Sequence, residues 1–256
     1  MGLESLYLFT LLGGLAAGTY AFETGLRRTR EGERPWLVPL IVVIVFLVGL
    51  IAAATHVNVG RAMSVAFGGT INFGSGMIRE VAVSALFFVL ALIDLIVTFA
   101  TKKSPYGLRI VTAIVGVICI VLMGAAYIDV YGVAVWTNAP ATILSFVGGD
   151  LAMGLALYAL LANVGYDDNA SRVSSIVVNV VLAIGLALEI MAFTSAGADP
   201  LTQIIGLVVA PIASIVLVAA GSKFGNKRTL AIIVCVLAIV GVAVSRYAFY
   251  ATCTMM

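Results

Sequence analysis

The segment WLVPLIVVIVFLVGLIAAAT, residues 36–55, decides the fold, because its 20 residues include no charged side chain. A helix of that length is about 30 Å long, which matches the hydrocarbon thickness of a bilayer. The rest of the 256-residue chain is similar in character, with 62% hydrophobic and 10% charged residues and a mean hydropathy of +1.18. No soluble core can bury so large an apolar fraction, so the sequence predicts an all-α polytopic membrane protein.

Eight stretches approach or reach the length of a spanning helix. The first lacks a basic leader and a small-residue cleavage site, so we expect it to be a retained helix rather than a signal peptide. We interpret residues 1–256 as a single integral membrane domain, in which eight helices can form two four-helix bundles. The predicted spans are 5–22, 36–55, 81–100, 108–128, 142–163, 173–194, 202–221 and 229–250.

The basic residues are distributed unevenly between the connections. Eleven of the 14 Lys and Arg residues fall in the connections after the first, third, fifth and seventh spans or directly beside them. The other connections contain only Arg61 and Arg79, while Arg246 lies within the last span. Because cytoplasmic connections carry the excess of Lys and Arg, this pattern predicts that both termini lie outside the cytoplasm.

Several classes of membrane and nucleic-acid-binding protein are excluded by composition. His56 is the single histidine and cannot supply both ligands of a bis-histidine haem. Cys119, Cys235 and Cys253 cannot provide four thiolates for an iron–sulfur cluster or an all-cysteine zinc site. All lysines lie in polar connections, which excludes a retinal Schiff base within a span, and a net charge of +2 does not suit nucleic-acid binding. We therefore expect no haem, metal or cluster in this chain.

Ionisable residues within the spans suggest a site near the outer surface. A charge at membrane depth costs about 2.5–3.5 kcal/mol on insertion scales, so such residues usually pair or function. Asp94 alone is expected near the middle of its span. A histidine, whose pKa is near neutral, and carboxylates suit a lipid-soluble quinol that releases protons. The alternative is a structural network, in which Arg246 neutralises a carboxylate and Asp94 makes an interhelical hydrogen bond. The residues toward the outer side are His56, Glu80, Asp150, Glu189 and Arg246.

Short motifs in a fixed order connect the chain to a known family. The motifs are Phe9-Thr10-x-x-Gly13-x-x-x-Ala17-Gly18, His56 followed by Gly60-Arg61-Ala62, Arg79-Glu80-Val81, Val130-Tyr131 with Trp136 and Gly148-Gly149, and Arg246-x-x-Phe249-Tyr250. Over nearly its full length the chain resembles the membrane anchor subunit of dimethyl sulfoxide reductase-type complexes. It departs from that family after His56, where a proline is missing and the segment is one residue shorter.

The resemblance implies an eight-helix anchor that serves anaerobic respiration in a bacterial or archaeal cytoplasmic membrane. Such an anchor oxidises menaquinol and passes the electrons to a four-cluster ferredoxin-like iron–sulfur subunit, which supplies a molybdenum bis-pterin catalytic subunit. By resemblance, His56 and Glu80 bind the quinol and accept its protons, and the loop with Arg61 and Arg79 lies near the partner together with Trp136. The supporting residues are Arg61, Arg79, Tyr131, Trp136 and Arg246, and a buried polar network can include Asp94, Asp150 and Glu189.

Three alternatives remain open from the sequence. An anchor of a polysulfide or tetrathionate reductase-type complex would have a similar architecture and the same need for quinone. A secondary transporter would explain Asp94 and the glycine-rich spans, although the sequence shows no matched pair of interrupted helices in two halves. A structural scaffold would use Gly14-x-x-x-Gly18 for helix packing, but it leaves the outer ionisable residues unexplained.

Overall fold

The computed structural model describes residues 3–27, 34–56, 74–130, 132–221 and 226–254. Within these ranges the chain is helical and contains no strand, and eight helices are long and apolar enough to cross a membrane. Both predictions, an all-α fold and eight spans, are confirmed. The elements are α1 Leu3–Leu26, α2 Leu37–His56, α4 Gly76–Thr101, α5 Tyr106–Ala125, α6 Ala139–Leu161, α7 Asn169–Ser195, α8 Leu201–Leu207, α9 Ala213–Ala219 and α10 Lys227–Ala251.

Most helices begin earlier than hydropathy predicts, because the polar residues that cap a helix start lower the local hydropathy. The Asp168 side chain accepts a hydrogen bond from the Ser171 N–H at 2.8 Å, so α7 begins at Asn169 rather than 173. Asn138 and Asn226 cap α6 and α10 in the same way. Helix α4 begins at Gly76, five residues before the predicted start of its span.

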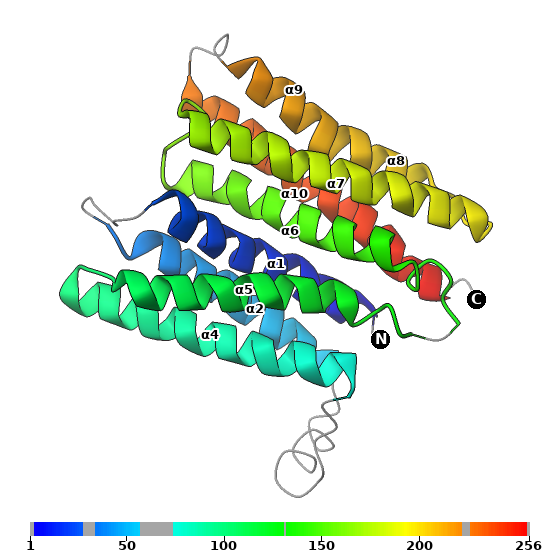
Figure 1. Cartoon of the computed structure of the whole chain (residues 1–256), viewed down its shortest axis with the longest axis horizontal. Coiled ribbons are helices and arrows are strands. Elements are labelled where there is room, and N and C mark those ends of the chain that lie inside the picture. Colours follow the sequence, from blue (N-terminus) through cyan, green and yellow to red (C-terminus); the bar gives the residue numbers. More distant parts are fainter. Residues whose placement is uncertain (1–2, 28–33, 57–73, 131, 222–225, 255–256) are drawn as a thin grey trace, which may run out of the picture.

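The helices form two four-helix bundles (Figure 1). In the first bundle, α1 packs on α2 and α5, and α4 packs on the same two helices. In the second, α6 packs on α7 and α10, and the span made of α8 and α9 closes the ring between them. The bundles meet where α1 crosses α6: a side chain added at Gly18 would collide with the Asp150 carbonyl oxygen, and one added at Gly154 with the backbone of Gly18. Small residues therefore let these two backbones approach closely.

The span after α7 contains a π-helical turn, Val208–Ile212, between α8 and α9. Pro211 lies inside this turn. Proline has no N–H to donate and its ring displaces the preceding carbonyl, so a wider turn accommodates it. Residues 202–221 were predicted as one span, and the π-helical turn lies within it. The equivalent third helix of the first bundle, α4, is continuous over its described length.

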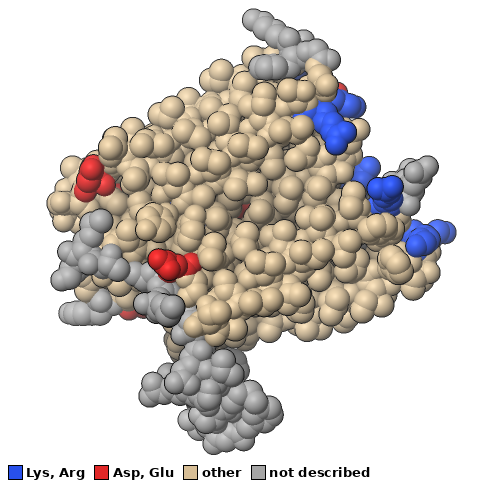
Figure 2. Space-filling view, turned by 180° about the vertical axis from the view of Figure 1, so that it is seen from behind, with Lys and Arg blue, Asp and Glu red and all other residues tan. Residues whose placement is uncertain are grey.

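The two ends of the molecule differ in charge. The start of α1 and the end of α10 lie at one end of the molecule, together with the ends of α2, α5 and α7; we call this the terminal end (Figure 1). The other end, where α1, α4, α6 and α9 end, is called the basic end. Figure 2 shows Lys and Arg side chains gathered at the basic end, whereas most Asp and Glu side chains on that face lie toward the terminal end. The charge difference predicted from the connections is thus visible in the folded chain.

Candidate functional site

Glu80 lies in the first turns of α4, near the terminal end. Its side chain is buried, with 4% of the residue exposed, because α4 starts against the end of α5, where Gly76 packs on the backbone of Ala126. Among the described residues, Glu80 Oε1 has no hydrogen-bond partner. A buried polar atom without a partner costs roughly 1–3 kcal/mol, so such atoms are uncommon in structures and often mark a site that binds something.

Three hydroxyl groups form a chain at the same end of the molecule as Glu80. The Tyr250 hydroxyl donates to the Tyr127 hydroxyl at 2.7 Å, and Thr10 Oγ1 lies 3.0 Å from Tyr250 Oη. Tyr127 lies just beyond the end of α5. Burial raises the pKa of Tyr127 well above 10, and the neighbouring Tyr250 and Glu80 act in the same direction. Tyr127 therefore keeps its hydroxyl hydrogen. Because Tyr250 is the donor in the bond between them, this hydrogen is not part of that bond.

Aromatic rings enclose these groups. Trp136 stacks on Phe249 with centroids 5.4 Å apart and donates from Nε1 to the Phe249 carbonyl oxygen at 2.8 Å. The Tyr127 ring meets Trp136 edge-on at 5.2 Å. Trp136 is 4% exposed, so its side chain packs inside the chain. That it lies near the partner stays a prediction. Its N–H is used to hold the connection after α5 against α10.

The remaining residues of the predicted site are only partly described. His56 is the last residue of α2, and its side chain lies outside the described part, as do Arg61 and Tyr131. Arg79 is exposed at the terminal end, one residue before Glu80. Within the described ranges, no group of three or more His, Cys, Asp or Glu side chains could hold a metal ion.

The family model for the DMSO reductase anchor subunit (DmsC) matches residues 2–197. The chain belongs to this family. The match covers Glu80, Tyr127 and Trp136, while α8, α9 and α10 follow it in sequence. No curated protein matches the chain. The resemblance found in the sequence is confirmed, and the protein is a multi-pass membrane anchor of the DmsC family.

Arg246 of this DmsC-family anchor connects its two bundles. Its Nη1 lies 2.6 Å from Asp150 Oδ1 and donates to the Thr10 carbonyl oxygen at 2.9 Å. Its guanidinium also lies over the Phe146 ring, 4.3 Å from the centroid. Arg246 thus links α10 to α1 and α6, a role that explains why a charged residue is buried here.

Glu189 is the second carboxyl group near Arg246, and both residues line the same small cavity. Glu189 accepts hydrogen bonds from the Ser145 hydroxyl and from Gln203 Nε2, the latter at 2.9 Å. The structure therefore brings Asp150 and Glu189 together around Arg246, in the arrangement that the sequence offered as the structural alternative. These contacts join α6, α7, α8 and α10 of the anchor.

Asp94 belongs to a separate network. It accepts hydrogen bonds from Tyr20 Oη at 2.7 Å, from Thr98 Oγ1 at 3.4 Å and from the Ser104 hydroxyl in the connection after α4. Asp94 was expected near the middle of its span, but its contact with Ser104 places it toward the basic end. It does not join Asp150 and Glu189.

Two residues of the site were missed as candidates in the sequence. Tyr127 and Tyr250 lie near the ends of spans, where tyrosine is usually explained by the membrane interface. In the structure they are 6% and 2% exposed and bonded to each other. Tyr250 was part of a quoted motif, whereas nothing in the sequence brings Tyr127 to it.

Proposed function

We propose that this chain anchors a DMSO reductase-type complex and oxidises menaquinol at the Glu80 site. The electrons pass to a four-cluster ferredoxin-like iron–sulfur subunit and from it to a molybdenum bis-pterin catalytic subunit. Family membership supports the anchor role. The observation that supports the quinol site is the buried Glu80 Oε1, which has no hydrogen-bond partner among the described residues.

The chemistry follows from the available lone pairs and protons. Oxidation of a quinol to a quinone releases two protons and two electrons. The Glu80 carboxylate accepts the hydrogen of one quinol hydroxyl and then its proton. The Tyr127 hydroxyl accepts from Tyr250 and can donate its own hydrogen to the same quinol oxygen, which becomes a carbonyl in the product.

The second quinol hydroxyl needs its own acceptor. His56 ends α2 at the terminal end, and Glu80 lies in the first turns of α4, so the two residues flank one connection. A histidine can accept a proton near neutral pH. We therefore assign the second proton to His56, and both protons leave toward the compartment that the terminal end faces.

The charge difference between the ends supports an orientation. With the basic end in the cytoplasm, the terminal end and the Glu80 site face outward. The iron–sulfur subunit then docks on the terminal end, and quinol protons and electrons leave on the same side. Turnover in that arrangement moves no charge across the membrane. It therefore stores no energy in the membrane potential, which is worth roughly 2.3 kcal/mol for each charge moved against 100 mV.

The test replaces Glu80 in the complete, membrane-bound complex. Glu80→Gln keeps the shape of the side chain but cannot accept a proton, so we expect menaquinol oxidation to fall at least ~100-fold. Reduction of the terminal acceptor by an artificial dye, which supplies electrons directly to the partner subunits, should stay unchanged.

The matched control is Glu4→Gln, which makes the same chemical change at an exposed residue of the terminal end. It should leave both activities unchanged. Normal menaquinol oxidation by an assembled Glu80→Gln complex would contradict the proposed site, while the anchor role would stand.

A further inference from the structure

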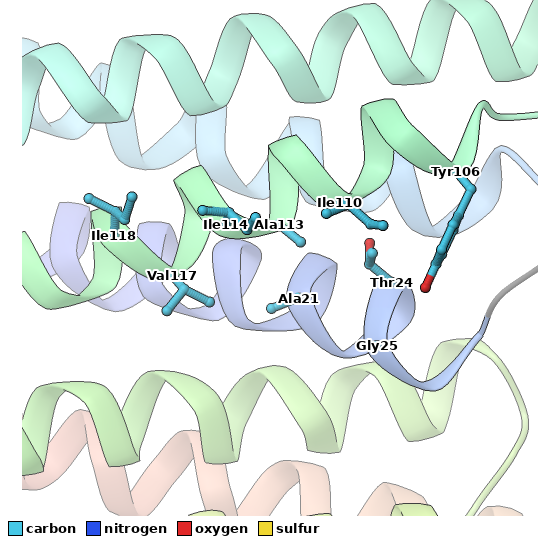
Figure 3. A pocket seen from close by; sticks show the side chains of 9 residues that line it. All are labelled: Ala21, Thr24, Gly25, Tyr106, Ile110, Ala113, Ile114, Val117 and Ile118. Atoms are coloured by element: carbon cyan, nitrogen blue, oxygen red, sulfur yellow. The ribbon is translucent and has the colours of Figure 1, made fainter.

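A groove of about 380 Å³ lies between α1 and α5, and Figure 3 shows the side chains that line it. It begins at Tyr106 near the basic end and continues along α5 to Ile118. The lining is apolar except for Thr24 and Tyr106. The lining residues are Ala21, Thr24, Gly25, Tyr106, Ile110, Ala113, Ile114, Val117 and Ile118.

The groove exists because α5 and α6 move apart and α1 lies between them. Near the terminal end α5 and α6 are in contact, with Gly124 close to Phe146 and Ile143. From there α5 and α6 diverge toward the basic end, and α1 lies between them (Figure 1). Since α5 belongs to the first bundle and α6 to the second, the groove lies beside the junction of the bundles.

Thr24 supplies a buried polar group to this groove. It is 5% exposed, and its Oγ1 has no hydrogen-bond partner among the described residues. Other threonines of the same helices bond to the preceding turn: Thr19 donates to the Leu15 carbonyl oxygen at 2.7 Å, and Thr112 donates to the Leu108 carbonyl oxygen at 2.8 Å. The Thr24 hydroxyl is therefore available to a ligand in the groove.

The length of the groove suits one membrane leaflet. Residues 106 to 118 of a helix span about 18 Å, and half of the hydrocarbon core is about 15 Å. Cationic residues are neighbours of the lining in sequence at the end of the groove nearest the basic end: Arg27 follows the α1 residues of the lining, and the exposed Lys102 and Lys103 precede Tyr106. Basic sites between spans on the cytoplasmic side favour anionic lipid headgroups.

We propose that this groove binds an anionic phospholipid of the leaflet at the basic end. An acyl chain lies along Ile110, Ala113 and Ile114, an ester carbonyl oxygen accepts the Thr24 hydrogen bond, and the phosphate lies among the cations at the mouth. A quinol fits less well, because the lining contains no carboxyl or imidazole group that could accept its protons. The lipid would fill the space where α5 and α6 separate, independently of the Glu80 site.

The test measures phospholipid retained by the full complex after purification from membranes in a mild detergent, by mass spectrometry of the intact anchor and of its extracted lipids. We expect the unaltered protein to retain an anionic phospholipid. Ala113→Phe fills the groove and should abolish the lipid-bound peak. Ala85→Phe, on the exposed surface of α4, places the same ring outside the groove and should retain it.

Thr24→Val keeps the side-chain shape, so it tests the ligand contact even where Ala113→Phe does not fold. It should weaken retention about fivefold, the effect of one lost hydrogen bond. Thr55→Val, at an exposed threonine that bonds its own helix, should have no effect.

In exchange with vesicles, phosphatidylglycerol should be retained in preference to phosphatidylcholine, and Arg27→Gln should reduce that preference. Equal retention by Thr24→Val and the unaltered protein, no retained phospholipid, no headgroup preference, or a retained quinone that Thr24→Val displaces would each overturn the proposal.

Discussion

Helix α4 carries two buried carboxyl groups with opposite surroundings. Asp94, toward the basic end, accepts hydrogen bonds from three hydroxyl groups, those of Tyr20, Thr98 and Ser104. Glu80, toward the terminal end, has a buried oxygen with no partner among the described residues. The two residues are 14 positions apart, which is about 21 Å along a helix. A carboxyl group whose bonds are all supplied by its own chain stabilises the fold, whereas one left open can serve a ligand.

The most direct way to break this comparison is to remove Asp94. Asp94→Ala leaves Tyr20, Thr98 and Ser104 without their shared acceptor, so we expect it to lower the free energy of unfolding by about 3 kcal/mol. Menaquinol oxidation per assembled complex should stay the same. The two measurements are unfolding in detergent and steady-state quinol oxidation. A stable Asp94→Ala protein that no longer oxidises menaquinol would reverse the assignment of the two carboxyl groups.

A matched pair of tyrosines sharpens the comparison. Tyr127→Phe removes the donor proposed to hold the quinol oxygen, and we expect menaquinol oxidation to fall roughly tenfold. Tyr20→Phe removes a donor to Asp94 and should lower the free energy of unfolding by about 1 kcal/mol without changing quinol oxidation. Both variants are measured in both assays. If each variant had the effect predicted for the other, the functional difference between the two regions would be refuted.

A third carboxyl group, Asp168 outside the spans, gives the smallest effect and a reference for the unfolding assay. Partial burial acts to raise its pKa, but hydrogen bonds from the Ser171 hydroxyl and from backbone N–H groups lower it by more. A lowered pKa means that the carboxylate stabilises the fold fully above its unfolded value near 3.9 and loses this effect as the pH falls through its lower folded value.

Asp168→Ala should therefore lower the free energy of unfolding by about 1 kcal/mol at pH 7, through loss of the cap of α7. The difference from the unaltered protein should shrink as the pH falls below the folded-state pKa. Asp168→Asn, which can still cap a helix, should lower the free energy of unfolding by less than Asp168→Ala does at pH 7. A difference that is the same at pH 7 and at strongly acidic pH would show that the charge of Asp168 contributes nothing.

The sequence is sufficient for the spans because membrane helices need long apolar runs. Residues 36–55 were predicted almost as α2 is observed, Leu37–His56. Helix starts were less accurate, since capping residues such as Asp168 are polar and do not enter a hydropathy average. The π-helical turn around Pro211 was missed because a proline in an apolar run permits several local geometries.

The candidate site was only partly predictable. The cost of burying a carboxyl group singled out Glu80 and Asp94 alike, and the quinol role of Glu80 came from family resemblance rather than from any contact that the sequence reveals. What distinguishes them is contact between helices: Tyr20 of α1 reaches Asp94, while Tyr127 and Tyr250 bond to each other at the same end of the molecule as Glu80. Such contacts depend on the rotation of each helix in its bundle, which a single sequence does not give.

The π-helical turn also sets the rotation of the helix that contains it. The buried residues Gln203, Gly206, Ala210, Ser214 and Val218 follow one another at intervals of three or four, mostly four. In a regular α-helix a run of four-residue steps drifts around the axis, because a turn holds 3.6 residues. The wider turn takes up the surplus and keeps Ser214 and Val218 on the face that packs in the bundle. Deleting one residue from Val208–Ile212 would rotate α9 by about 100° relative to α8 and carry that face toward lipid. The number of residues in this span therefore decides which side chains of α9 face the bundle.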